Sequence, residues 1–239
     1  MSWGWPESVD IYLSQRLALV RVGSTPPLAL SYSPTLPLAV VLERLTAAAF
    51  SSKSRRRFRI TLSSGVAPAC AYRVPREVTR WSEKLELARA AAAQSLAIQP
   101  ELVDCQIDSR GRGFAAAMAV QTSRQLHAWA ASLGARVVSI QPLWSIATQC
   151  RAAATSAIDA VVVLEPDGGS ILVRPIGQAP AIARALAWGE AAAVRSEAVA
   201  IAQEAGVKEE RMLSLGFGAT MNEINATFPK SWARHWCKP

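Results

Sequence analysis

The sequence lacks any apolar run that could cross a bilayer. Its longest candidates, such as Phe114–Val120, fall far short of the roughly 18 to 20 residues that a spanning helix needs. The opening residues, MSWGWPESVD, also lack a basic segment followed by an apolar one, which is the pattern of an export signal. Charged residues are few, at 18%, while apolar residues make up 51%, and this balance excludes a disordered chain. We therefore expect a folded, cytoplasmic protein.

Cysteine and histidine are also sparse, and their spacing excludes the common metal sites. None of the four cysteines has a CxxC or CxxxxH neighbour, so we expect reduced thiols in the protein interior and no metal. They are Cys70, Cys105, Cys150 and Cys237. His127 lies in a predicted helix without a nearby Asp or Cys that could pair with it for proton transfer. No catalytic residue is assigned from this pattern.

Acidic residues are outnumbered, with 18 Asp and Glu against 26 Lys and Arg, which gives a net charge of +8. Such an excess favours an acidic partner: nucleic acid, an anionic membrane face or an acidic protein surface. Lys53–Arg59 holds five basic residues, but Phe58 is the one aromatic among them, whereas nucleic-acid binding favours interleaved aromatics. We expect a patch that faces solvent, lipid or protein. Nucleic-acid binding stays as a third hypothesis, which predicts an affinity that falls steeply with salt.

The clearest pattern is a pair of hairpins far apart in the chain. Within Asp159–Gly177, two apolar runs flank Glu165-Pro166-Asp167-Gly168-Gly169, and Asp-Gly and Gly-Gly tolerate the positive φ angles of tight hairpin turns. Val9–Gly23 has a similar arrangement, and Leu19–Gly23 differs from Leu172–Gly177 mainly by one inserted proline. A hairpin that recurs predicts a chain built of two similar halves.

Hydrophobic periodicity and turn residues between these hairpins predict alternating strands and helices, and hence an α/β architecture. Ser82 is the expected N-cap of one helix, and Thr122 or Ser123 that of the next. The expected strands are Val9–Leu13, Leu17–Val22, Leu28–Leu30, Phe58–Leu62, Cys70–Val74, Val103–Asp108, Phe114–Val120, Ala135–Ile140, Ala160–Leu164, Ile171–Val173 and Met212–Leu215. The expected helices are Leu38–Phe50, Ser82–Ala97, Arg124–Leu133, Leu143–Ala153, Ala181–Ala205 with a break near Trp188-Gly189, and Thr220–Phe228.

Three stretches carry a family resemblance. They are Tyr72–Pro75 followed by Ser82–Ala97, Ala131–Ile140 leading to Leu143–Ala147, and the central hairpin. The chain resembles the actin-like platform proteins of type IV pilus assembly, the PilM family, and is similar to the cytoplasmic part of the type II secretion L proteins. The resemblance implies an actin-like (ribonuclease H-like) α/β fold of two lobes. The first lobe would span residues 1–157, with an inserted α+β subdomain at 76–134, and a shortened second lobe would span 158–239.

The resemblance also implies a nucleotide site between the lobes. Carried over, its residues are Asp10, Ser14 and Gln15 in the first half, Asp167, Gly168 and Gly169 in the second hairpin, and Gly216 and Gly218 near the adenosine. The first loop has no glycine, although backbone N–H groups cradle phosphate best where no Cβ obstructs them. We expect weak or lost binding of ATP with Mg²⁺, and Asp167-Gly168-Gly169 also suits a plain hairpin turn. The alternative is an actin-like ATPase or small kinase.

For the partner, the resemblance implies a groove between the first lobe and the inserted subdomain, near Arg76, Arg80, Trp81, Lys84 and Trp129. Such a groove would bind a short cytoplasmic segment of a bitopic inner-membrane protein, and an assembly ATPase is a further partner that it admits. Arg76 and Arg80 would share one side if this segment is helical. The leading hypothesis is thus a scaffold at the cytoplasmic face of a pilus or secretion platform, peripheral to the inner membrane. The system, the partner's identity and the oligomeric state stay open.

Overall fold

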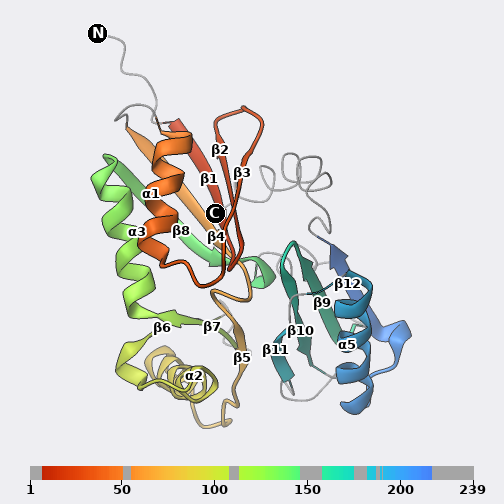
Figure 1. The fold of residues 1–239 in the computed structure, drawn as a ribbon. Helices are drawn as coiled ribbons and strands as arrows, with labels where there is room; N and C mark the ends of the chain where they lie inside the picture. Colours follow the sequence, from red (N-terminus) through yellow and green to blue (C-terminus); the bar gives the residue numbers. More distant parts are fainter. Residues whose placement is uncertain are drawn as a thin grey trace.

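The computed structural model describes residues 7–50, 55–107, 113–145, 158–174, 182–186, 189 and 191–216. Figure 1 shows two lobes side by side, with a smaller sheet and one helix extending from the first. None of the described helices combines the length and the apolar character that a bilayer span requires. The arrangement confirms the α/β, two-lobed fold that the repeated hairpins predict.

The first lobe is a five-stranded sheet with the order β3-β2-β1-β4-β8. Its strands are β1 (Glu7–Leu13), β2 (Leu17–Val22), β3 (Leu28–Ser31), β4 (Arg56–Leu62) and β8 (Ala135–Pro142). β1 is antiparallel to β2 and parallel to β4, and β4 is parallel to β8. Val9, Ile11 and Leu13 alternate along β1 and share a core with residues of helices α1 (Leu38–Ala49) and α3 (Val120–Ser132). Period-two alternation therefore sends one face of β1 towards these helices.

The inserted sheet has the order β5-β7-β6 and is covered by helix α2. Its elements are β5 (Ala69–Ala71), α2 (Trp81–Leu96), the short 3-10 helix η1 (Pro100–Leu102), β6 (Val103–Ile107) and β7 (Phe114–Ala119). Alanines of the helix pack on Cys70, Cys105 and alanines of the sheet, and small side chains permit this close approach. β5 pairs with β7, so this sheet starts before residue 76, and α3 buries Trp129 in the first-lobe core.

The second lobe is a four-stranded sheet, β11-β10-β9-β12, against which helix α5 packs. Its elements are β9 (Ala160–Glu165), β10 (Gly168–Val173), β11 (Ile182–Leu186), α5 (Ala191–Glu204), the 3-10 helix η2 (Glu209–Arg211) and β12 (Met212–Gly216). β9 is antiparallel to β10 and parallel to β12, which repeats the relation of β1 to β2 and β4. The hairpin at Asp159–Gly177 is thus the counterpart of the first one.

The two lobes share a buried cluster, here called the interlobe core. It includes Tyr12 and Leu19 from the first sheet and Val163 and Leu172 from the second. The remaining buried members are Leu17, Ala69, Ala116, Leu143 and Trp144. β11 also lies beside β5, so the second lobe contacts the inserted sheet as well (Figure 1). The hydrophobic effect therefore holds the lobes together independently of any ligand.

Four expectations for single elements are wrong. Residues 182–186 form strand β11, not helix, because β10 provides an edge whose pairing outweighs the helix propensity of alanine. α2 begins at Trp81, after Arg80, so Ser82 is no cap, and α3 begins at Val120 without any side-chain cap from Thr122 or Ser123. β5 is also shorter than the expected strand. Leu143–Ser145 is helical, while the rest of that predicted helix and the one at Thr220–Phe228 lie outside the described residues.

Candidate functional site at the lobe junction

Loops from both lobes meet where the central strands end. Because β1 and β4 are parallel, their carboxyl ends lie at one edge of the first sheet, followed by residues 14–16 and 63–67. The turn of the β9–β10 hairpin reaches this edge from the second lobe, through hydrogen bonds of Glu165 and Asp167. Carboxyl ends of parallel strands are the usual position for binding sites in α/β proteins. This junction is therefore the candidate functional site.

The first loop is closed by its own serine. The Ser14 hydroxyl accepts hydrogen bonds from the backbone N–H groups of Arg16 (3.2 Å) and Leu17 (2.9 Å) and donates one to the Leu17 carbonyl. Tyr32 Oη donates to the Ser14 carbonyl at 2.6 Å. Burial, with a smaller effect of the Asp167 charge, raises the pKa of the Tyr32 phenol far above its usual value. The predicted nucleotide residue Ser14 thus has its hydroxyl engaged within its own turn.

The next residue of this loop connects the two lobes. The Gln15 backbone N–H donates to Asp167 Oδ2 at 3.0 Å, and Tyr12 Oη donates more weakly to Asp167 Oδ1 at 3.4 Å. Gln15 Nε2 also donates to the Gly65 carbonyl at 2.9 Å. A Cβ on Gly65 would lie 2.9 Å from Gln15 Cδ, so glycine leaves the room that this side chain occupies. Two of the predicted nucleotide residues, Gln15 and Asp167, are therefore in direct contact.

A second interlobe connection is buried. The Ser64 backbone N–H donates to Glu165 Oε2 at 2.8 Å, and its hydroxyl donates to the Gly169 carbonyl at 2.6 Å. Burial raises the pKa of the Glu165 carboxyl to about 8. The hydrogen bond from Ser64 lowers this pKa, and the charge of Asp167 raises it further. Sequence reasoning missed Ser64. The available signal was the Ser63-Ser64-Gly65 turn directly after a buried strand.

The hairpin glycines have backbone reasons to be glycine. Gly168 has a φ of +150°, a backbone conformation that residues other than glycine rarely adopt. A Cβ on Gly169 would lie 2.6 Å from the Val163 carbonyl oxygen and 3.2 Å from Val194 of α5. Gly216 is the last residue of β12 and pairs with Leu164, and Gly218 lies outside the described residues. The two hairpin glycines therefore serve the turn and helix packing, whatever else they contact.

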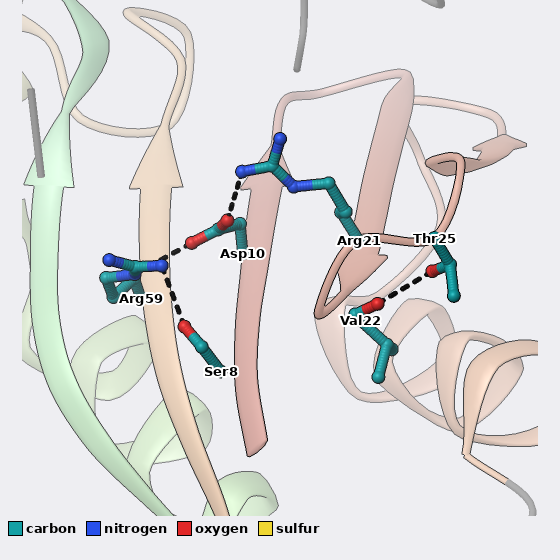
Figure 2. A network of polar contacts seen from close by, with 6 residues as sticks. All are labelled: Ser8, Asp10, Arg21, Val22, Thr25 and Arg59. Atoms are coloured by element: carbon teal, nitrogen blue, oxygen red, sulfur yellow. Dashed lines mark hydrogen bonds and ion pairs between the residues drawn. The ribbon is translucent and has the colours of Figure 1, made fainter. Parts of the chain in front are cut away.

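Asp10 belongs to a charged network on β1. Its carboxylate is buried and pairs with Arg21 of β2 and, at 2.8 Å, with Arg59 of β4, which also donates to Ser8 (Figure 2). These side chains come from three neighbouring strands of the sheet. A buried carboxylate between two guanidinium groups is satisfied by strong charge-assisted hydrogen bonds. The structure thus places this predicted nucleotide residue in an ion-pair network of the first lobe.

The junction as it stands does not fit a polyphosphate. Two loop N–H groups at this edge, those of Gln15 and Ser64, already donate to the side chains of Asp167 and Glu165. A phosphate that bound these N–H groups would have to displace both carboxyl groups, and the negative charge of Asp167 would repel it. Within the ranges that the structure describes, no three Asp, Glu, His or Cys side chains gather as metal ligands would. The geometry therefore supports structural contact between the lobes.

The predicted partner-binding residues fall into two groups. Arg76 and Arg80 are exposed, and Trp81, at the start of α2, is 50% exposed. Their segment is a turn followed by extended backbone, with φ −72° and ψ 137° at Arg80. Because the segment is not helical, the four-residue spacing does not place Arg76 and Arg80 on one side. Lys84 follows, half-buried, in the first turn of α2. The four residues thus lie at the start of α2 or just before it, and the three other than Lys84 are exposed.

Trp129, the fifth predicted residue, is instead buried in the first lobe. Its ring lies 5.2 Å from that of Phe58 and 6.0 Å from that of Phe50, and its Nε1 donates to Thr46 Oγ1 at 2.9 Å. It reaches the floor of a groove of about 460 Å³ between α1 and α3. The groove is lined by Ala39, Leu42, Glu43, Thr46, Ala47, Gln125, Ala128, Trp129 and Ser132. None of the four residues near the start of α2 lines it, so the structure does not unite the predicted set in one hollow.

The paired hairpins, the two sheets with a shared core and the inserted subdomain define an actin-like fold, and solved structures confirm it. A protein of actin-like ATPase fold and unknown function from Bacteroides thetaiotaomicron matches 97% of this chain over 96% of its own length, with a TM-score of 0.60 and 13% identity. No protein-family model and no curated protein matches the sequence.

Two further structures are similar to this chain. The cytoplasmic domain of EpsL, an inner-membrane component of the type II secretion system of Vibrio cholerae, has a TM-score of 0.51 at 14% identity, covering 88% of this chain and 82% of that one. The PilM-PilN type IV pilus biogenesis complex gives a TM-score of 0.50 at 13% identity, covering 96% of this chain and 71% of that one. At these identities the likeness concerns the fold.

Proposed function

We propose that this protein is a cytoplasmic scaffold of a type IV pilus or type II secretion inner-membrane platform. In this role it binds a short peptide of a membrane-anchored partner and sits peripheral to the inner membrane. The observation that carries the proposal is the fold shared with the EpsL cytoplasmic domain and with a PilM-PilN complex. The carboxyl groups at the lobe junction support a role that does not depend on nucleotide.

The surface at the start of α2 has the chemistry for peptide capture. Trp81 offers a large exposed aromatic side chain, and Arg76 and Arg80 are exposed beside it in sequence. Aromatic and arginine side chains supply most of the binding energy in many interfaces, the aromatic by burial and the arginine by directed hydrogen bonds. The partner segment would thus be extended, with an apolar anchor and acidic or carbonyl groups next to it.

Titration calorimetry with synthetic N-terminal segments of bitopic membrane proteins tests this proposal. We expect Trp81→Ala to weaken binding by about tenfold or more, since it removes an aromatic anchor. Leu102→Ala is the matched control, because Leu102 is a similarly exposed apolar residue, at 53%, in the same subdomain. Ala128→Glu, which places a charge in the α1–α3 groove, should leave the affinity unchanged. If no segment binds a folded sample at high micromolar concentration, the proposal is wrong.

The alternative, an actin-like ATPase or small kinase, makes the opposite prediction for Asp167. It requires Mg-ATP between the lobes, with Asp10 and Asp167 near the phosphates. A calorimetric titration with Mg-ATP separates the two functions. Micromolar binding that Asp167→Ala abolishes would overturn the preference for the scaffold, which expects weak or no binding in the wild type.

A further inference from the structure

We infer that Glu165 and Asp167 form an interlobe clasp, in which the protein's own carboxyl groups occupy the loop amides that a nucleotide's phosphates would need. The clasp consists of Gln15 and Ser64 on the first lobe and of Glu165 and Asp167 on the second. It closes the junction without a ligand and excludes polyphosphates. This inference concerns the junction alone and holds whichever partner the protein binds.

The chemistry of the contact supports this substitution. Backbone N–H groups at loop positions bind phosphate because they donate to negatively charged oxygens without carrying charge themselves. Carboxyl oxygens accept the same hydrogen bonds, and here Asp167 Oδ2 lies 3.0 Å from the Gln15 nitrogen and Glu165 Oε2 lies 2.8 Å from the Ser64 nitrogen. Each amide can donate to one acceptor well at a time. A phosphate oxygen therefore competes directly with the hairpin of the second lobe.

The four clasp residues differ in their exposure to water, which predicts how the clasp opens. Ser64 and Glu165 are buried, and the Ser64 hydroxyl adds a third interlobe hydrogen bond, to the Gly169 carbonyl at 2.6 Å. The Gln15 backbone bond to Asp167 is exposed. Hydrogen bonds that water can reach are the first to open in native proteins. We therefore expect the Asp167 half to open locally while the Glu165 half stays closed.

Tyr12 connects the clasp to the interlobe core beneath it. The ring belongs to that core, and the hydroxyl donates to Asp167 Oδ1 at 3.4 Å. Burial raises the pKa of the Tyr12 phenol well above its ordinary value, and the Glu165 and Asp167 charges add to this, so the hydroxyl keeps its proton for donation. Opening the clasp widely would expose part of an apolar core. This cost favours the closed arrangement even when one hydrogen bond breaks.

Residue-resolved amide hydrogen exchange on the full chain tests the clasp. In the wild type, we expect the Gln15 amide to be protected although its loop is exposed, because Asp167 accepts its hydrogen bond. Asp167→Ala should increase exchange at Gln15 by about tenfold or more and leave Ser64 unchanged. Asp167→Asn keeps an acceptor oxygen and should preserve most of the protection. Glu101→Ala, an exposed carboxylate in the inserted subdomain, is the matched control. An unprotected Gln15 in the wild type, or no change in Asp167→Ala, would overturn the inference.

Titration with inorganic pyrophosphate tests the exclusion of polyphosphates. We follow the Gln15 amide signal, which should not respond in the wild type and should shift saturably in Asp167→Ala. If that variant does not fold, Asp167→Gly serves instead, because glycine also removes the acceptor and is well tolerated in a hairpin turn. A response of the wild type equal to that of the variant, or no response in the variant, would contradict the proposed substitution. Both outcomes are independent of the peptide titrations that test the scaffold function.

Discussion

Replacing Glu165 with glutamine should change how stability depends on pH. The Glu165 carboxyl is buried, and its burial, together with the charge of Asp167, raises its pKa to about 8 despite the hydrogen bond from Ser64. In the unfolded chain, a glutamate titrates near pH 4.3. Between these values the folded protein holds a proton that the unfolded chain releases. The contribution of the protonated Glu165 carboxyl to the free energy of unfolding is therefore fully present below the pKa that the group has in the unfolded chain. It is lost as the pH rises towards 8.

The size of the effect follows from the same linkage. Each pH unit within this window lowers the free energy of unfolding by up to about 1.4 kcal/mol, so that the whole window contributes at most about 5 kcal/mol. Glutamine cannot ionise, and its carbonyl oxygen can still accept the hydrogen bond from Ser64. We expect Glu165→Gln to match the wild type within about 1 kcal/mol near pH 5 and to exceed it by a few kcal/mol near pH 9.

Urea unfolding followed by tryptophan fluorescence, at several pH values from 5 to 9, measures this difference. The comparison between the wild type and Glu165→Gln isolates one group, because all other titrating groups are common to both. Glu101→Gln is the control, since Glu101 is exposed and should leave the pH profile unchanged. Parallel pH profiles for the wild type and Glu165→Gln would refute the reasoning, because they would mean that Glu165 is already ionised in the folded protein.

Three further substitutions test the packing by urea unfolding. Asp10→Ala leaves two arginines without their shared carboxylate and should cost about 3 kcal/mol, and a loss below about 1 kcal/mol would contradict the buried ion pair. Gly169→Ala should lower the free energy of unfolding by more than Gly206→Ala does, because the new methyl group meets a carbonyl oxygen at position 169 but open space at position 206. At position 206 only the positive φ is unfavourable, by about 1 kcal/mol. Equal costs would show that the close approach is absent. Trp129→Ala should cost about 3 to 5 kcal/mol, whereas the exposed Trp81→Ala should stay within about 0.5 kcal/mol, and the reverse order would contradict their burial.

Local signals predicted the architecture well where they agreed with the tertiary environment. The Asp167-Gly168 turn between two apolar runs identified the β9–β10 hairpin, and its likeness to the first hairpin identified the two lobes. β11 was missed because Ile182–Leu186 is rich in alanine, and its strand form depends on the neighbouring edge of β10. Propensity cannot report an edge that a distant segment creates.

The junction was predicted only in part. The sequence pointed to Gln15 and Asp167, and the structure brings them together. Nothing in the sequence indicated that one of these residues would be the other's hydrogen-bond partner, because they lie 152 positions apart. Ser64 and Glu165 are separated by 101 positions, and neither belongs to a pattern that names the other. Periodicity describes which face of an element is buried, whereas such contacts depend on how two finished lobes meet.

The distribution of core residues along the chain has a consequence for synthesis on the ribosome. Every member of the first-lobe core lies between residues 9 and 140, and every member of the second-lobe core lies beyond residue 159. The interlobe core instead joins Tyr12 and Leu19 to Val163 and Leu172. The first lobe can therefore bury its own core before the second lobe has been translated. The face of β1 that carries Tyr12 is buried only once the second lobe has folded against it. Until then the nascent chain exposes Tyr12 and Leu19, where chaperones or neighbouring chains can bind.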